Sequence, residues 1–213
     1  MERRWDRLGE VWEKRRRRLA ELKDRRLHIT LVFRLCFFIT DILRAADVLE
    51  PLKPLEKWVF GRPTPAALLS VASKPMVIVE ETGAVRLCNT LSIQMFDPIG
   101  IRIWLLLASP TLALLSERAV KTILVHELLH MAGITSEEEV EQRVREAARL
   151  KPDLFASIEE ADREVREEAV QVVLLGEPLV DMHILPSDPS RLTFRDLLPL
   201  ISAQISMERC FFP

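Results

Sequence analysis

The chain has 213 residues, with 30 Lys and Arg side chains, 32 Asp and Glu side chains and a formal net charge of −2. A chain of this length can bury one sizeable core, so we expect one domain with additional segments at its ends. The near-neutral charge argues against the class of proteins that bind polyanions over their whole surface.

The cysteines and amide side chains indicate the environment of the protein. Cys36, Cys88 and Cys210 are far apart in the sequence, and no Cys-x-x-Cys pair occurs. We therefore expect free, buried thiols and a reducing, cytoplasmic location. A single asparagine, Asn89, beside abundant arginine and glutamate is typical of heat-adapted proteins.

The amino-terminal residues 1–27 are basic, with eleven Lys and Arg side chains against six acidic ones. The basic run from Lys14 to Arg18 leaves open a contact with nucleic acid or with an anionic membrane surface. The other interpretation is an amphipathic helix that packs one stripe against the body, because five apolar side chains recur at helical spacing. These side chains are Trp5, Leu8, Trp12, Leu19 and Leu22.

Residues 28–49 form a more apolar segment. Arg34 lies in its middle and Asp41 near its end, so its apolar runs are far shorter than the about 20 residues that span a bilayer. We expect a buried helix whose charged side chains reach solvent, and no membrane span. The prolines between residues 51 and 75 then predict a connector with short helical pieces.

The sequence next changes to the period of β-structure. Residues 76–81 and 84–93, on either side of a turn at Thr82 and Gly83, predict a hairpin. Residues 101–108 predict a third strand, because they are apolar and rich in branched side chains.

Helices are predicted for most of the remaining chain. Ser116 can cap a helix that Gly133 would end. Thr135 or Ser136 can cap the next helix, because each has a glutamate three residues later. The later expectations are helical segments to about Leu175, a loop over residues 176–189 and a last helix over residues 193–207.

The first of these helices contains His126-Glu127-Leu128-Leu129-His130, which has the HExxH pattern. Residues four apart lie on one face of a helix, so two imidazoles can bind one zinc ion at about 2.0–2.1 Å. Glu127 stands where it can hold a water and act as general base without being a ligand. Two unpaired histidines in an otherwise apolar helix would be costly. The pattern predicts one catalytic zinc ion per chain, with His126 and His130 as ligands.

The segment from Leu112 to His130, LALLSERAVKTILVHELLH, resembles the core of the zincin metallopeptidases. Among these it is most similar to the gluzincins, whose third ligand is a glutamate on the next helix. The order of strands and helices over residues 76–150 is similar to that of minigluzincins. The resemblance implies a zinc-dependent peptidase with peptide or protein substrates, which the strand 101–108 would hold by edge pairing.

The resemblance also implies a third ligand. In gluzincins, an acid one helical turn after the ligand glutamate hydrogen-bonds the first histidine, and Glu137 and Glu141 have this spacing. Both also flank the apolar face of their helix. We expect Glu137 to be the ligand and Glu141 to bond His126, although the two roles could be exchanged.

The connection from His130 to Glu137 is shorter than in thermolysin-like gluzincins. It is closer to the metzincin pattern HExxHxxGxxH, in which Gly133 matches the glycine but Ser136 replaces the last histidine. Met182 is the candidate for the methionine turn of metzincins. The gluzincin interpretation fits the acidic residues after Ser136 better.

The remaining histidines have weaker patterns. His28 begins an apolar helix, and we expect it to be structural. His183 follows Asp181 by two residues in a predicted loop. Because thermolysin-like enzymes stabilise the oxyanion with a histidine from their carboxy-terminal part, the resemblance suggests this catalytic role for His183. A surface histidine in a loop is the alternative.

These patterns together predict a zincin-like α+β fold. A small antiparallel or mixed sheet would pack on an active-site helix and a following glutamate helix, with extra helices at both ends. The expected parts are a helical extension (1–50), a proline-rich connector (51–75), a zincin-like catalytic core (76–150) and a helical carboxy-terminal part (151–213). The competing function is a binding protein whose metal is structural or absent and whose basic helix contacts nucleic acid, a membrane surface or a protein.

Overall fold

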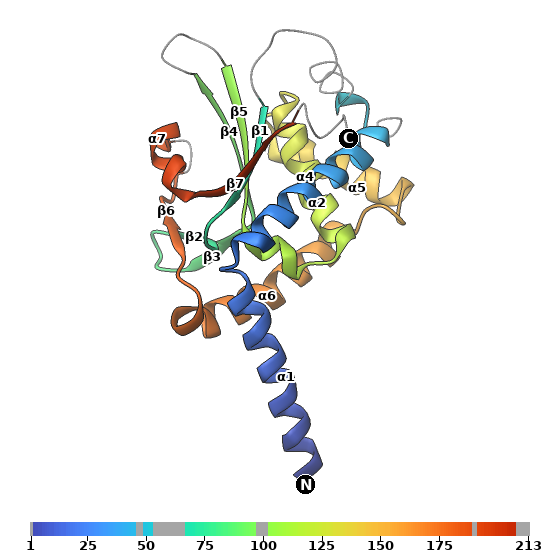
Figure 1. Ribbon diagram of the computed structural model, residues 1–213. Coiled ribbons are helices and arrows are strands. Elements are labelled where there is room, and N and C mark those ends of the chain that lie inside the picture. The colour runs from blue at the N-terminus through green and yellow to red at the C-terminus, as the bar shows by residue number, and fades with distance from the viewer. Residues whose placement is uncertain (1, 46–48, 53–66, 97–101, 189–190, 208–213) are drawn as a thin grey trace.

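The computed structural model of the chain describes residues 2–45, 49–52, 67–96, 102–188 and 191–207. Within them the protein has an α+β fold with two small mixed sheets, which confirms the predicted class (Figure 1). The larger sheet has the order β4-β5-β1-β7, in which only β5 and β1 are parallel. The smaller sheet has the order β3-β2-β6, with β2 antiparallel to β3 and parallel to β6. The strands are β1 (Ala67–Ala72), β2 (Met76–Val79), β3 (Val85–Cys88), β4 (Thr90–Phe96), β5 (Arg102–Ala108), β6 (His183–Leu185) and β7 (Ile201–Ser206).

Helices α2, α4 and α5 lie on one side of the larger sheet, and α2 and α4 pack against that face (Figure 1). The α-helices are α1 (Glu2–Glu21), α2 (Arg25–Arg44), α4 (Glu117–Met131), α5 (Glu137–Leu150), α6 (Ile158–Leu179) and α7 (Phe194–Leu197). Short 3-10 helices are η1 (Glu50–Leu52), η2 (Pro110–Leu114) and η4 (Leu198–Leu200).

The side chains of strand β5 are buried on both faces of the larger sheet. Side chains of a strand alternate between faces, and Leu106 and Ala108 join the apolar cluster of α2 and α4. Leu105 and Leu107 join a second cluster, which also contains Met76 of the smaller sheet. A strand that is covered on both faces has a continuous apolar sequence, as this one does.

Helix α2 is the buried helix that was predicted for this segment. Its exposed Arg34 lies over the ring of Phe38, and Asp41 accepts a hydrogen bond from the buried Lys121 of α4 at 2.8 Å. Burial lowers the pKa of Lys121, but hydrogen bonds to Asp41 and Glu117 outweigh it and leave that pKa raised. Across the described ranges, no helix combines the length and apolar character that crossing a bilayer requires.

Helix α1 is only partly docked. Leu19 and Leu22 are buried in an apolar cluster with residues of α6 and the smaller sheet. The amino-terminal part of the helix projects from the body (Figure 1). There Val11 is 50% and Trp12 48% exposed, so of the predicted docking stripe Leu19 and Leu22 are buried and Trp12 is not, while the side chains of Trp5 and Leu8 lie outside the described part of the chain.

The predicted last helix over residues 193–207 is wrong. The helices α7 and η4 are short, and the segment ends in β7, which pairs antiparallel with β1. Pro199 removes a backbone donor and prevents a longer helix. The pairing partner of β7 lies far away in the sequence, so no local pattern could indicate it.

The β-region also differs in its boundaries. The turn of the predicted hairpin is confirmed, with Gly83 at a φ of 80°, and it joins β2 to β3. The expected strand 84–93 divides at Asn89 into β3 and β4, which belong to different sheets. Strand β1 occupies the end of the predicted connector, whose residues 53–66 lie outside the described ranges.

The cysteines differ from one another. Cys88 is a free and buried thiol, as expected. Cys36 is disulfide-bonded, so the expectation of a free thiol is wrong for this residue. Cys210 lies outside the described residues.

Candidate metal centre

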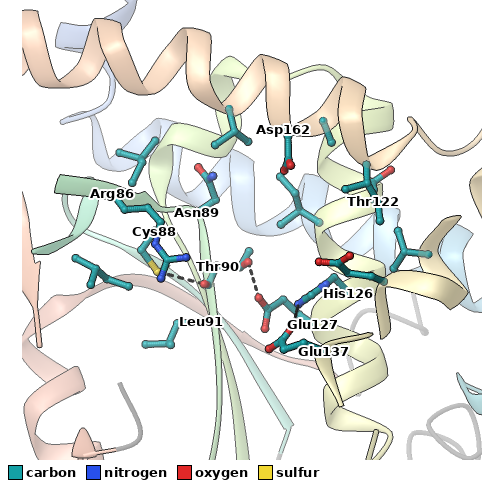
Figure 2. A pocket seen from close by; sticks show the side chains of 18 residues that line it. Arg86, Cys88, Asn89, Thr90, Leu91, Thr122, His126, Glu127, Glu137 and Asp162 are labelled. Carbon is teal, nitrogen blue, oxygen red and sulfur yellow. Dashed lines mark hydrogen bonds and ion pairs between the residues drawn. The ribbon is translucent and has the colours of Figure 1, made fainter. Parts of the chain in front are cut away.

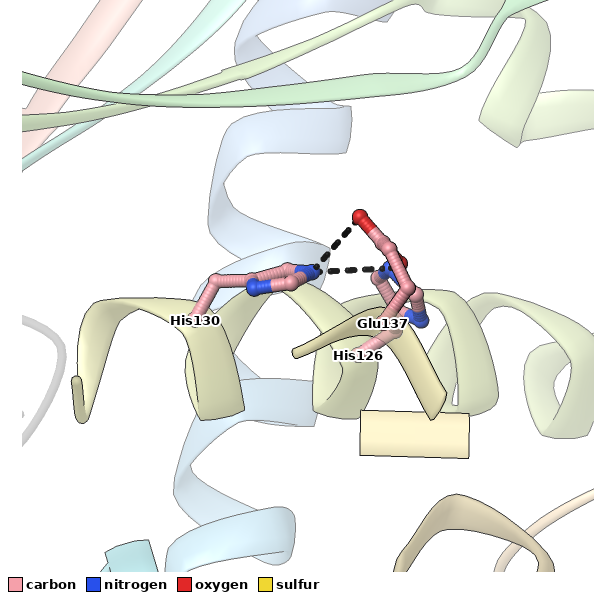
Figure 3. A group of neighbouring side chains, drawn as sticks. All are labelled: His126, His130 and Glu137. Carbon is pink, nitrogen blue, oxygen red and sulfur yellow. Dashed lines mark hydrogen bonds and ion pairs between the residues drawn. The ribbon is translucent and has the colours of Figure 1, made fainter. Parts of the chain in front are cut away.

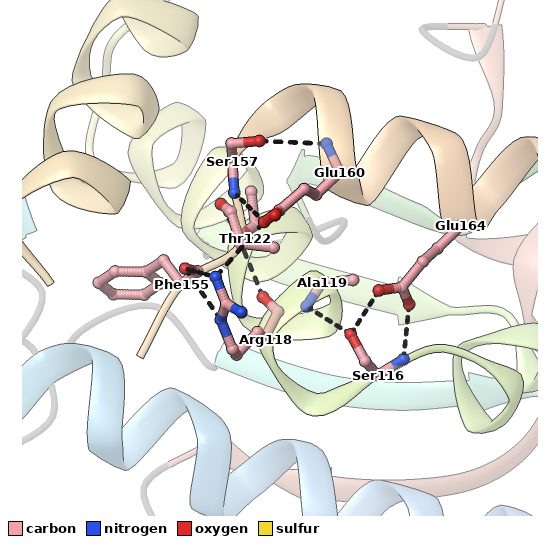
Figure 4. Close-up of polar contacts among 9 residues, drawn as sticks. Ser116, Arg118, Ala119, Thr122, Phe155, Ser157, Glu160 and Glu164 are labelled. Carbon is pink, nitrogen blue, oxygen red and sulfur yellow. Dashed lines mark hydrogen bonds and ion pairs between the residues drawn. The ribbon is translucent and has the colours of Figure 1, made fainter. Parts of the chain in front are cut away.

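Helix α4 is fixed at its start by the segment that leads into α6 (Figure 4). Ser116 caps α4, as predicted, and donates from its backbone and hydroxyl to Glu164 at 2.8 and 2.7 Å. Arg118 donates to the carbonyl of Phe155, and the hydroxyl of Thr122 donates to the carbonyl of Ala156. These contacts set the position of the face of α4 that carries the histidines.

His126 and His130 project from the same face of α4 (Figure 3). Their Nε2 atoms are 3.2 Å apart, and the rings meet at 72° with centroids 4.8 Å apart. The i and i+4 spacing therefore brings the two imidazoles together, as the sequence predicted.

Glu137 of α5 completes the group. Its Oε2 lies 3.3 Å from Nε2 of His126, and its Oε1 lies 3.4 Å from Nε2 of His130. Ligand atoms at about 2.0–2.1 Å from one tetrahedral ion lie about 3.3–3.4 Å apart, because a tetrahedron's edge is about 1.6 times its centre-to-vertex distance. The shortest separations are close to this spacing, with a different carboxylate oxygen nearest each nitrogen, and one ligand atom from each residue lies within 4.8 Å of the others. The three residues could therefore hold a metal ion.

The turn after α4 determines which nitrogen of His130 carries the proton. Gly133 has a φ of 101° and ends the helix as predicted, while the backbone N–H of Ile134 donates to the carbonyl of Leu129. The carbonyl of Ile134 then lies 2.8 Å from Nδ1 of His130. A carbonyl can only accept, so Nδ1 holds the proton and Nε2 presents its lone pair to the metal group.

The start of α5 distinguishes the two candidate carboxylates. Ser136, not Thr135, caps this helix, so Glu137 is its first residue and faces the histidines. Glu141 lines the cavity that lies over the three residues, but its carboxylate accepts a hydrogen bond from Arg145 at 2.9 Å. The structure thus brings Glu137 to the imidazoles, and it gives Glu141 no hydrogen bond to His126.

Glu127 contacts β4 and is not part of the metal group (Figure 2). Its Oε1 accepts a hydrogen bond from the hydroxyl of Thr90 at 2.9 Å. The Cys88 thiol in turn donates to the carbonyl of Thr90 at 3.2 Å. Burial, and secondly the charge of Glu127, raise the pKa of Cys88 to about 12, so the thiol keeps the proton that it donates.

A cavity of about 460 Å³ lies over this group, between α4, α5, α6 and the strands β3 and β4. Its lining includes His126, Glu127 and Glu137 on one side. Apolar side chains such as Leu91, Val144 and Val165 form much of the remaining wall. The cavity therefore brings together residues of a group that could hold a metal ion, the carboxylate of Glu127 and an apolar surface.

Strand β4 forms the sheet edge beside this cavity, because β5 is its one neighbour among the described strands. The backbone N–H of Ser109 donates to the carbonyl of Asn89, which makes Asn89 a residue whose backbone faces β5. Backbone direction alternates in an antiparallel pair, so Thr90, Ser92 and Gln94 turn their backbone groups outward. The strand 101–108 is β5, which is internal, so the prediction that it offers a free edge is wrong.

His183 does not line this cavity. It begins β6 in the smaller sheet, where its Nε2 lies 2.8 Å from Oγ of Ser73, and the neighbouring Asp181 pairs with Lys74. Met182 packs beside an apolar cluster with Leu19 and is not part of the cavity lining. The structure therefore gives no support to oxyanion stabilisation by His183 or to a methionine turn at Met182.

Thr90 and Cys88 are the residues of the site that sequence reasoning missed. Both lie in a segment predicted as one plain strand, and neither belongs to a motif. Their contact with Glu127 depends on the packing of β4 against α4. The one local signal was the asparagine between them, which the rest of the chain otherwise lacks.

The geometry of the site can be set beside known proteins. No protein-family model, curated protein or solved structure matches the chain.

Proposed function

We propose that the protein is a zinc-dependent peptidase whose zinc ligands are His126, His130 and Glu137 and whose general base is Glu127. The observation that carries this proposal is the spacing of 3.2 to 3.4 Å between the ring nitrogens and carboxylate oxygens of the three residues. This spacing is close to that of ligand atoms around one tetrahedral ion, and the carboxylate of Glu127 lies beside the group without belonging to it.

The donor set favours zinc over other common ions. Two imidazole nitrogens and one carboxylate oxygen suit zinc, whereas magnesium and calcium prefer oxygen ligands. Three protein ligands leave a fourth position free, and the side chain of Glu137 is 72% exposed, so solvent can reach the group. This arrangement is that of a catalytic site and not of a closed structural site.

The residues of the chain divide the reaction between them. A bound zinc ion would polarise the substrate carbonyl and lower the pKa of a water. Glu127 takes a proton from this water as its oxygen adds to the carbonyl carbon. When the carbon–nitrogen bond breaks, Glu127 returns the proton to the leaving amine.

The free edge of β4 suits an extended peptide. Thr90, Ser92 and Gln94 turn their backbone groups away from β5, and Thr90 also contacts Glu127. A peptide that pairs with this edge would lie along the cavity and across the metal group. We therefore assign substrate binding to β4 in place of β5.

The resemblance to gluzincins supports this proposal. The helix with HExxH, the glutamate at the start of the next helix and a sheet edge beside the first helix are the features that a zincin-like fold would supply. The short connection from His130 to Glu137 departs from thermolysin-like enzymes. Gly133 and the cap at Ser136 nevertheless allow Glu137 to reach both histidines.

Metal analysis and a cleavage assay test the proposal together. Protein purified without added metal should contain about one zinc ion per chain and should cleave members of a peptide library. A chelator should remove the activity, and added zinc should restore it. Protein without zinc, or with zinc but without cleavage of any peptide, would contradict the proposal.

A binding protein is the second candidate, and the projection of α1 favours it. The exposed part of α1 carries Val11 and Trp12 beside the basic run from Lys14 to Arg18. Replacement of Lys14, Arg15, Arg16 and Arg17 by glutamine would spare the docked Leu19 and Leu22 and should abolish salt-sensitive binding to DNA, RNA or anionic vesicles. Absence of any such binding by the full chain at low salt would exclude this function.

A further inference from the structure

Thr90 joins the substrate edge to the proposed base. Its backbone turns outward at the free edge of β4, while its hydroxyl donates to Oε1 of Glu127 at 2.9 Å (Figure 2). Among the described residues this is the hydrogen bond that the Glu127 carboxylate receives. The bond engages one oxygen, and Oε2 has no hydrogen-bond partner among the described residues.

Thr90 is itself held in place from two sides. The Cys88 thiol donates to its carbonyl at 3.2 Å. The preceding residue, Asn89, is also held. Its side-chain oxygen accepts a hydrogen bond from the Thr111 hydroxyl, and its backbone carbonyl accepts one from the backbone N–H of Ser109. Asn89 is thus anchored to η2 and its cap, and Thr90 pairs with Ala108 of β5, so the backbone that carries the hydroxyl is held in place.

We propose that Thr90 is a positioning residue that holds Glu127 by Oε1, so that Oε2 faces the water whose proton it takes. A glutamate has three side-chain torsions, and one fixed oxygen removes most of the freedom of the other. Because the same residue lies at the edge that binds substrate, pairing of a peptide with β4 and orientation of the base depend on one strand. This inference rests on the proposed peptidase function.

The kinetic test compares two substitutions at Thr90. Thr90→Val keeps the shape of the side chain and removes the hydroxyl, and it should lower kcat about 10- to 100-fold. KM and zinc content should stay unchanged, because neither the backbone edge nor a ligand is altered. Thr90→Ser restores the hydroxyl and should restore most of kcat. Thr30→Val is the matched control, since the Thr30 hydroxyl bonds the Arg26 carbonyl on α2, outside the cavity.

A second test does not need catalysis. Thermal unfolding of the parent, Thr90→Val, Glu127→Ala and the double variant, with chelator present, forms a double-mutant cycle. The decrease in Tm caused by Thr90→Val should be about 2–5 °C larger in the parent than in the Glu127→Ala background, because the hydrogen bond exists only in the parent. Additive shifts would mean that Thr90 does not hold Glu127.

The outcomes separate the two proposals. Unchanged kcat in Thr90→Val, a change confined to KM, or failure of Thr90→Ser to restore kcat would overturn the role of Thr90 and leave the peptidase function intact. A parent that binds no zinc or cleaves no peptide would overturn the function, and the positioning role with it. Loss of kcat in Thr90→Val, its recovery in Thr90→Ser and a non-additive cycle together support the role.

Discussion

His126 and His130 differ from His28 and His183 in what their ring nitrogens contact. Nε2 of His28 donates to the carbonyl of Leu22 at 2.6 Å, and its Nδ1 lies 2.8 Å from Oγ of Ser202. Nε2 of His183 lies 2.8 Å from Oγ of Ser73. In α4, by contrast, two Nε2 atoms face each other and a carboxylate.

The different contacts indicate different roles for the two kinds of histidine. Both ring nitrogens of His28 contact groups of the protein, and the residue is only 1% exposed. These contacts join α2 to β7 and to the end of α1. In the α4 pair, His130 presents the lone pair of its Nε2 to the group, since Nδ1 holds the proton. A lone pair beside a second imidazole and a carboxylate can be satisfied by a shared cation, which the contacts of His28 would not allow.

Removal of a ligand should have the largest effect on this comparison. His126→Ala deletes one of three ligands, so zinc should fall from about one per chain to near none, and hydrolysis should be lost with it. Metal analysis of the purified variant and the peptide assay measure both quantities. Retention of zinc by this variant would mean that the ion, if present, binds elsewhere.

Glu127→Gln separates the base from the ligands. The amide keeps the size of the side chain and can still accept from Thr90, but it cannot take a proton. Zinc should remain near one per chain while kcat falls by roughly 10²-fold or more. A variant that cleaves peptides as fast as the parent would show that Glu127 is not the base.

The two candidate glutamates of α5, Glu137 and Glu141, should differ in the same assay. Glu137→Ala removes a carboxylate within 3.4 Å of both histidines and should cost most of the zinc affinity. Glu141→Ala removes a carboxylate that bonds Arg145, and its effect should be at most about 10- to 100-fold, the size expected for an acid that only orients a ligand. Competition with a chelator measures both affinities. The reverse order would exchange the two roles.

The sequence predicted those parts of the site that depend on short separations along the chain. HExxH and the helix stop at Gly133 act within a few residues, so local chemistry indicated that His126 and His130 meet an acid of the next helix. It left open whether Thr135 or Ser136 caps that helix and whether Glu137 or Glu141 is the acid, and the structure brings Glu137 to both histidines. The contact of Thr90 with Glu127 and the pairing of β7 with β1 join distant segments, and they depend on how whole elements pack. The same reason explains His183, whose partner Ser73 was not visible from its own neighbours.

His28 should matter for stability and not for metal. His28→Ala removes two hydrogen bonds and leaves the Leu22 carbonyl without its donor, at a cost of about 2–4 kcal/mol in the free energy of unfolding. The expected decrease in Tm is roughly 5–15 °C. Folded protein should retain zinc in the metal analysis. A parallel loss of zinc at temperatures where the variant is folded would contradict the division between the two kinds of histidine.

His183 should have the smallest effect, and its signature is a dependence on pH. Burial, and secondly the charge of Lys74, lower the pKa of His183 below its ordinary value of 6.5. Below that value the unfolded chain binds the proton more readily than the folded one, so stability decreases as the pH falls from 6.5 through the folded pKa. His183→Gln can keep a hydrogen bond to Ser73 and does not titrate, so its Tm should decrease less than that of the parent between pH 7.5 and 5.5. At pH 7.5 its kcat and zinc content should equal those of the parent. A large loss of kcat would instead return His183 to the catalytic residues.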